Sequence, residues 1–134
     1  MNEYIYKMKL NFPALFKVDV NKYKYFLIHG NDLVVFERSI SFLNKKLSCP
    51  LELSSEKDFL EKTAQEQSLF APAHPQSITL ISNASDKIIP HLTQEKEGIY
   101  IFTSEKARAQ SKLVLHFTSS PLGLAISAYA SPLV

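Results

Sequence analysis

The chain has 134 residues, which is enough for one domain with a sizeable apolar core. Apolar residues make up 46% and charged residues 21%. A net charge of +2 is too small for a dedicated nucleic-acid binder, which usually gathers many lysines and arginines on one face. One cysteine, Cys49, excludes an internal disulfide and indicates a reducing compartment. Because the sequence has neither a membrane-spanning apolar stretch nor a signal peptide, we expect a cytoplasmic protein with no membrane contact.

The first predicted elements are a buried strand and a long amphipathic helix. Residues 25–29 form a short apolar run that is closed by Gly30, a pattern typical of a strand buried on both faces. Asn31 or Asp32 can cap the following helix, because a short polar side chain accepts hydrogen bonds from its first amides. Apolar residues at spacings of three and four predict one buried stripe along this helix, made of Leu33, Phe36, Ile40, Leu43 and Leu47.

The rest of the chain continues to alternate between strands and helices. Residues 51–53 predict a short strand, and Ser55 can cap a helix over about 56–65. Alternation of this kind favours an α/β fold with a mostly parallel sheet that is covered on both faces. The later predicted elements are a strand over 77–81, a short helix over 86–92, a strand over 98–103, a helix over 106–117 and a strand over 124–129.

The sequence lacks the motifs of common enzymes that use an α/β sheet. A phosphate-binding loop needs several glycines and a lysine, whereas the turn after the first strand reads His29-Gly30-Asn31-Asp32-Leu33. The two-glycine dinucleotide fingerprint and the serine hydrolase elbow are also missing. The four histidines are scattered, and Cys49 beside Pro50 is best explained as a small apolar filler. We therefore predict a protein that is not itself an enzyme and that has no cofactor or metal.

Two features remain without an assigned role. Leu69 and Phe70 follow a polar segment and precede Pro72, so they form either an apolar plug at the tip of a loop or an anchor in the protein's own core. Three basic residues recur near one face of the predicted late helix. They form either a solvated surface or a contact site, and they are Lys106, Arg108 and Lys112.

Four segments in order resemble the N-terminal domain of the delta subunit of the bacterial DNA polymerase III clamp loader. The two most specific are the loop Ser68-Leu69-Phe70-Ala71 and the basic helix over 106–117 with its Ser111-Lys112-Leu113 sequence. The strand and turn over 25–32 and the apolar strand over 99–102 match as well, and 125–129 follows the helix as expected. Together the matching segments cover about residues 25–129.

The resemblance implies an AAA+-like (RecA-like) fold with a degenerate phosphate loop. It further implies an accessory subunit of a DNA-directed DNA polymerase complex that binds the sliding clamp, the beta subunit of DNA polymerase III, and opens the ring for loading. DNA would be contacted only indirectly, and other clamp-loader subunits would be partners of a longer chain. By this resemblance the clamp-binding residues are Leu69 and Phe70, with Ser68, Gln67 and Gln65 as polar neighbours.

The chain departs from this family in length. Residues 1–134 would form a single N-terminal clamp-binding domain, without the lid and collar domains of the family. Two other interpretations stay open. One is a degenerate nucleotide-binding ATPase fragment, which the α/β pattern suggests. The other is a small α/β scaffold protein in which Leu69 and Phe70 lie in the core.

Overall fold

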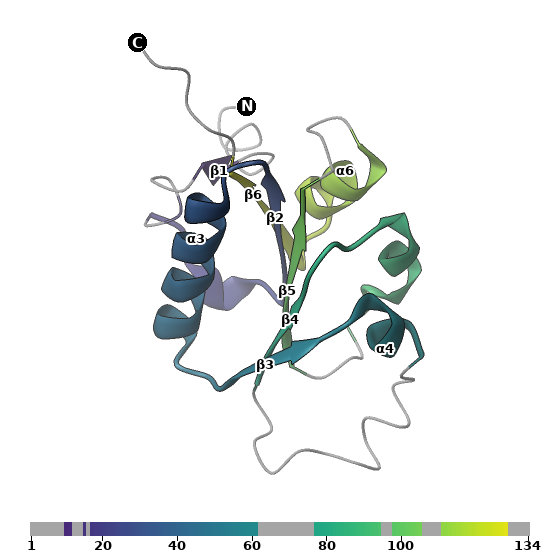
Figure 1. Ribbon diagram of the computed structural model, residues 1–134, viewed down its shortest axis with the longest axis horizontal. Coiled ribbons are helices and arrows are strands. Elements are labelled where there is room, and N and C mark those ends of the chain that lie inside the picture. The colour runs from purple at the N-terminus through teal and green to yellow at the C-terminus, as the bar shows by residue number, and fades with distance from the viewer. Residues whose placement is uncertain are drawn as a thin grey trace.

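A computed structural model describes residues 10–11, 15, 17–61, 77–94, 98–105 and 111–128. Its centre is a six-stranded sheet in the order β1-β6-β2-β5-β4-β3, in which every neighbouring pair is parallel. Helices cover both faces, so the predicted α/β class with a mostly parallel sheet is confirmed (Figure 1). The strands are β1 (Leu10–Asn11), β2 (Tyr25–Gly30), β3 (Leu51–Ser54), β4 (Ile78–Ile81), β5 (Ile99–Ser104) and β6 (Gly123–Ala128).

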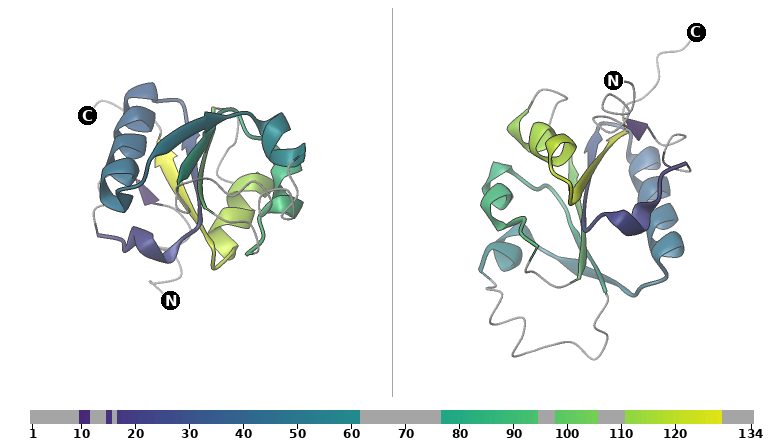
Figure 2. Two further views of the ribbon diagram at one scale, coloured as in Figure 1. Left: turned by 90° about the horizontal axis from the view of Figure 1, so that it is seen from below. Right: turned by 180° about the vertical axis from the view of Figure 1, so that it is seen from behind.

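The helices form two layers with the twisted sheet between them, as the views from below and from behind show (Figure 2). One layer holds α3 and the short 3-10 helix η1, and the other holds α4, the 3-10 helix η2 and α6. In chain order they are η1 (Val20–Lys22), α3 (Leu33–Leu47), α4 (Glu56–Glu61), η2 (Asp86–His91) and α6 (Lys112–Ser119).

Strand β2 is buried along its whole length because it lies inside the sheet and has helices on both sides. Its residues alternate between the two layers: Phe26 and Ile28 join the core under α3, and Leu27 joins the core on the opposite face. Helix α3 adds Phe36 and Leu43, which are 6% and 0% exposed. The short apolar run of the sequence is therefore a buried strand, as predicted.

Aromatic rings fill much of the core under α4, η2 and α6. Phe59 of α4 meets Tyr100 and Phe102 of β5 edge to face, with ring centroids 5.3 and 5.2 Å apart. Phe117 of α6 meets Phe102 in the same way at 6.0 Å, and Tyr25 stacks on Tyr100 at 5.5 Å. Such pairs contribute about 0.5–1.5 kcal/mol beyond the burial of their area. They fix α4 and α6 against the centre of the sheet.

The half-buried carboxylate of Glu56 joins α4 to η2. The Ser85 amide and hydroxyl both donate to Glu56 Oε2, at 2.5 and 2.8 Å. The Ser85 hydroxyl also caps η2 by accepting from the Lys87 amide at 3.3 Å. At the start of α4 itself, the Ser55 hydroxyl accepts from the Asp58 amide at 3.1 Å, as predicted. The first turn of α4 is therefore held from two sides.

Two sequence predictions about the helices were wrong. Leu33 was expected in the buried stripe of α3, but it lies in the first turn and is 57% exposed. The late helix was expected from Lys106, but Ser111 has extended backbone angles and caps a helix that begins at Lys112. A single helix through residue 111 is therefore excluded. The sequence also gave no indication of the short elements β1 and η1.

Candidate functional site

The turn between β2 and α3 is where a phosphate-binding loop would lie, because the positive end of a helix follows a buried strand there. Gly30 has φ of 143°, a conformation that favours glycine, and the chain then enters α3. Asp32 is the N-cap, and its Oδ1 accepts from the amides of Val34 and Val35 at 3.1 and 3.3 Å. A carboxylate of the chain itself thus occupies the position in which a phosphate would sit.

The backbone of the same turn is also engaged. The amides of Asn31 and Asp32 both donate to the carbonyl of Ala128, at 3.0 and 2.9 Å. Ala128 is the last residue of β6, the strand next to β2. A phosphate here would have to displace these bonds and lie beside the Asp32 carboxylate, which repels it. The geometry therefore disfavours nucleotide binding at this turn and agrees with the degenerate loop predicted from the sequence.

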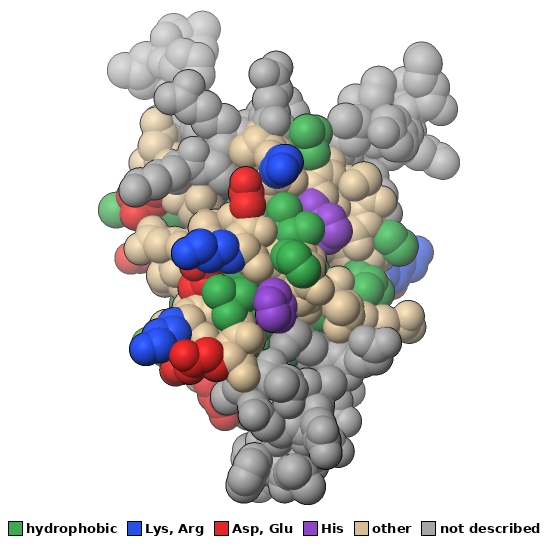
Figure 3. Space-filling model, turned by 90° about the vertical axis from the view of Figure 1, so that its right-hand side faces the viewer, with side chains coloured by type: hydrophobic (Ala, Val, Ile, Leu, Met, Phe, Trp, Pro, Cys, Tyr) green, Lys and Arg blue, Asp and Glu red, His purple; other side chains and the backbone are tan. Residues whose placement is uncertain are grey.

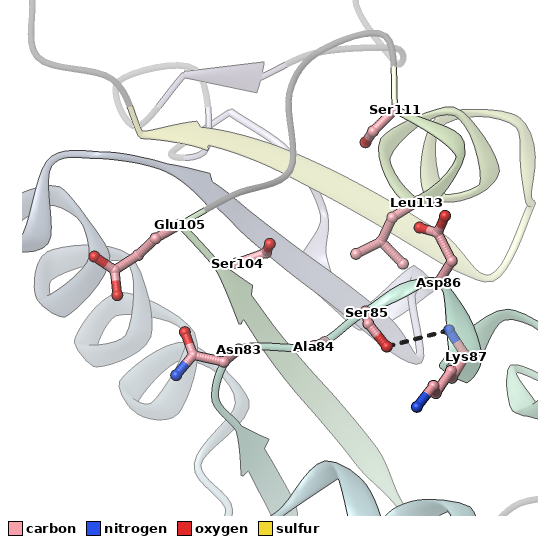
Figure 4. Close-up of a pocket in the computed structure, with 9 residues that line it drawn as sticks. All are labelled: Asn83, Ala84, Ser85, Asp86, Lys87, Ser104, Glu105, Ser111 and Leu113. Atoms are coloured by element: carbon pink, nitrogen blue, oxygen red, sulfur yellow. Dashed lines mark hydrogen bonds between the residues drawn. The ribbon is translucent and has the colours of Figure 1, made fainter.

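A cavity of about 730 Å³ opens at the carboxyl ends of β4 and β5 (Figure 4). Ligands often bind at this edge of a parallel sheet. In Figure 4, Asn83 and Ser85 lie on the segment after β4, Ser104 on β5, and Ser111 and Leu113 at the start of α6. Its remaining lining residues are Ala84, Asp86, Lys87 and Glu105.

The polar groups of this cavity serve mainly to build the fold. The hydroxyls of Ser85 and Ser111 cap η2 and α6, the latter by accepting from the Val114 amide at 3.3 Å. Among the described residues, no histidine or cysteine lines the cavity. Within the described ranges, no group of three or more histidine, cysteine, aspartate or glutamate residues could hold a metal ion. The described lining of the cavity is thus made of short polar side chains, three charged side chains, one alanine and one leucine.

The predicted clamp-binding residues lie in the segment between α4 and β4. Gln65, Gln67, Ser68, Leu69 and Phe70 are all outside the described residues, so their exposure stays a prediction. The described ends of this segment are well fixed. Glu61 ends α4, which is anchored by buried Phe59, and the Ile78 amide at the start of β4 donates to the carbonyl of Pro50 at 2.8 Å.

Of the three predicted basic residues, the structure describes only Lys112. It is exposed in the first turn of α6, whereas Lys106 and Arg108 lie outside the described residues. On the face over α4, η2 and α6, basic and acidic side chains are interspersed, and no basic patch forms among the residues coloured by type (Figure 3). The described residues of this face therefore form no basic stripe of the kind that follows a nucleic-acid backbone.

Cys49 and the three described histidines, His29, His91 and His116, belong to no metal-binding group among the described residues, and His74 lies outside them. Cys49 is half-buried against the core under α3, and its Sγ lies 3.1 Å from the carbonyl of Leu47, as expected of a small filler. His116 has its Nε2 buried with no hydrogen-bond partner among the residues that the structure describes, and desolvation lowers its pKa below the usual 6.5. Among the described helices, none is long and apolar enough to cross a bilayer.

Comparisons with known proteins reveal a relative of this structure but none of this sequence. No protein-family model matches the chain, and no curated protein matches it either. Among solved structures, the Bacillus subtilis DNA clamp loader delta protein (YqeN) matches with a TM-score of 0.51 and 10% sequence identity. The match covers 87% of this chain but only 41% of the longer protein. At this identity the similarity concerns the fold, and the chain has the fold of part of a clamp loader delta protein, as its resemblance predicted.

Proposed function

We propose that this chain is a non-catalytic module of the DNA replication machinery that binds a sliding clamp. The observation that carries the proposal is the similarity in fold to a DNA clamp loader delta protein over 87% of the chain. The filled turn at Asp32 supports it, because a clamp-binding subunit needs no phosphate site of its own. The protein would act in the cytoplasm, would contact DNA only through the clamp and would not act as an enzyme by itself.

Leu69 and Phe70 are the proposed anchors of the interface, with Gln65, Gln67 and Ser68 as polar neighbours. Burying each apolar side chain in a cleft of the clamp contributes about 1.5–3 kcal/mol. Two adjacent anchors of this size can dominate a small interface. Lys106, Arg108 and Lys112 are a further candidate contact surface.

Opening a clamp would require no bond chemistry from this chain. A subunit that binds the open ring more tightly than the closed ring shifts the equilibrium between them by the difference in affinity. In a full clamp loader this preference would open the ring for loading onto DNA. Because the chain corresponds to 41% of the delta protein it matches, assembly with other loader subunits is proposed only for a longer chain.

The test is binding of the double variant Leu69→Ala, Phe70→Ala to the immobilised sliding clamp of the same organism. We expect its Kd to rise by at least about a hundredfold, the equivalent of losing some 3 kcal/mol of apolar contact. The matched control, Leu33→Ala with Leu115→Ala, removes two leucines that are 57% and 46% exposed elsewhere on the surface, and it should bind normally.

Circular dichroism melts of both double variants distinguish lost contact from lost fold. Undiminished clamp binding by the Leu69→Ala, Phe70→Ala variant would refute the proposed site. Absence of binding by the unchanged protein would refute the proposed function. If the double variant instead melted well below the control, the pair would belong to the core, as the scaffold interpretation requires.

A further inference from the structure

Strand β3 forms one edge of the sheet, and its two leucines lie at the surface. In the strand order β3 has β4 on one side and no described strand on the other. Leu53 is 80% exposed and Leu51 is 37% exposed, whereas their register partners on β4, Leu80 and Ile78, are half-buried and buried. A short edge strand normally carries polar or charged side chains. Two exposed leucines there call for a specific explanation.

Leu51 and Leu53 lie next to Ile78 and Leu80 and continue the apolar core under α3 toward the edge of the sheet. Side chains of register partners in a parallel sheet point to the same face, and Ile78 and Leu80 belong to or pack against the core under α3. Helix α3 packs mainly over β2 and β6, toward the opposite edge. Leu51 and Leu53 therefore lie on the α3 face of the sheet at the end that α3 covers least.

The backbone of β3 supplies hydrogen-bonding groups along the same edge. The amide of Ile78 donates to the carbonyl of Pro50 at 2.8 Å, which sets the phase of the β3–β4 ladder. Groups alternate in direction along a parallel strand, so the amides and carbonyls of Leu51 and Leu53 face away from β4. Backbone donors, backbone acceptors and apolar side chains thus coincide at the same two residues.

The charge of Glu52 favours a different protein, rather than a second copy of this chain, as the partner of the β3 edge. In the antiparallel self-pairing that matches both leucines of one copy with those of the other, Glu52 would stand directly opposite its own copy. Like charges in that position destabilise a strand pair. A different segment with a basic residue opposite Glu52 and apolar residues on either side would complement all three side chains.

We propose that the free edge of β3 binds an extended segment of a partner protein, with an apolar-basic-apolar sequence, as a seventh strand. Its backbone would pair with Leu51 and Leu53, and its apolar side chains would cover them on the α3 face. This surface is separate from the proposed clamp-binding residues, since neither Leu69 nor Phe70 takes part. The inference can therefore stand or fail independently of the proposed function.

The test is a titration of the full ¹⁵N-labelled chain with two capped peptides, Ser-Val-Lys-Val-Ser and Ser-Val-Glu-Val-Ser. We expect the lysine peptide to shift the amide resonances of Leu51–Ser54 and to slow hydrogen exchange at Leu51 and Leu53. The glutamate peptide should bind more weakly, by up to about fivefold in Kd. Equal binding of both peptides, shifts centred elsewhere or no shifts at all would overturn the proposal.

Four variants sharpen the result. Leu53→Pro removes the outward amide and the leucine but no bond of the β3–β4 ladder, so binding should be lost. Leu53→Ser is the milder version if the proline variant does not fold. Leu115→Ala removes an exposed leucine of α6 and should leave binding intact. Glu52→Lys should reverse the preference between the two peptides.

The same samples test the alternative occupant. The unchanged chain should remain monomeric in analytical ultracentrifugation at the concentrations of the titration. A dimer that Leu53→Pro abolishes would show that a second copy occupies the edge, and it would overturn the proposed partner.

Discussion

Replacing Ser39 by alanine should stabilise the protein. Ser39 lies on the buried face of α3 with 0% exposure, and its Oγ has no hydrogen-bond partner among the described residues. A buried hydroxyl without a partner costs about 1–3 kcal/mol of desolvation. Alanine removes that cost and adds helix propensity of about 0.5 kcal/mol, offset by the small space that the oxygen leaves. We expect a net gain of about 1–2 kcal/mol in the free energy of unfolding.

Urea denaturation at neutral pH measures this gain, and a thermal melt should show a rise in Tm of about 3–8 °C. Ser41→Ala is the matched control, because Ser41 lies on the same helix but is exposed. It isolates the propensity difference, which should be no more than about 0.5 kcal/mol. If Ser39→Ala destabilised the protein, or gained no more than Ser41→Ala, the hydroxyl would have a stabilising partner and the reasoning would be refuted.

Two further predictions concern helix ends and pH. Asp32→Ala should lower the free energy of unfolding, measured in urea, by about 1 kcal/mol, because the amides of Val34 and Val35 lose their acceptor. Asp32→Asn should lower it clearly less, because asparagine also caps helices. Equal losses for the two variants would contradict the capping role. For His116, burial lowers the pKa in the folded state, so the unfolded state binds the proton more readily. Stability should be highest above pH 6.5 and fall as the pH drops from 6.5 toward the lowered pKa, and His116→Gln should flatten this slope between pH 7.5 and 5.5. An NMR titration midpoint of His116 at or above 6.5 would contradict this cause.

Local patterns in the sequence were enough to predict most of the sheet. The run over 25–29 and the aromatic, β-branched run over 98–103 became the central strands β2 and β5, because strands buried on both faces need continuous apolar sequence. The pattern could not decide between Asn31 and Asp32 as the cap of α3. The carbonyl of Ala128 also accepts from both of their amides, and no local rule includes a residue so distant in the chain.

The wrong predictions concern the first residues of two helices, whose burial and start depend on the rest of the fold. Spacing placed Leu33 on the apolar stripe of α3, but spacing cannot tell that the first turn of a helix extends beyond the core. Apolar positions in the late helix were correct, since Leu113, Val114 and Phe117 are buried. Its start was wrong because Ser111 caps the helix, which a basic, helix-favouring sequence before it concealed.

Only part of the candidate site could be predicted from the sequence. The missing glycines predicted that the turn after β2 would not hold phosphate, and the Asp32 carboxylate supplies the physical reason. The bond between Glu56 and Ser85 joins residues 29 positions apart, and no motif predicts such a pair. The roles of Leu69 and Phe70 stay predictions, because those residues lie outside the described ranges.

The hydrogen bonds in the turn between β2 and α3 bear on whether a nucleotide could drive a conformational change there. In a nucleotide-driven machine, the phosphate end of the sheet is the place at which hydrolysis is converted into motion. Here the carbonyl of Ala128 and the carboxylate of Asp32 accept hydrogen bonds from the amides of the turn and of the first turn of α3. The amides of this turn are therefore already bonded within the chain, and binding a phosphate here would first require these bonds to break.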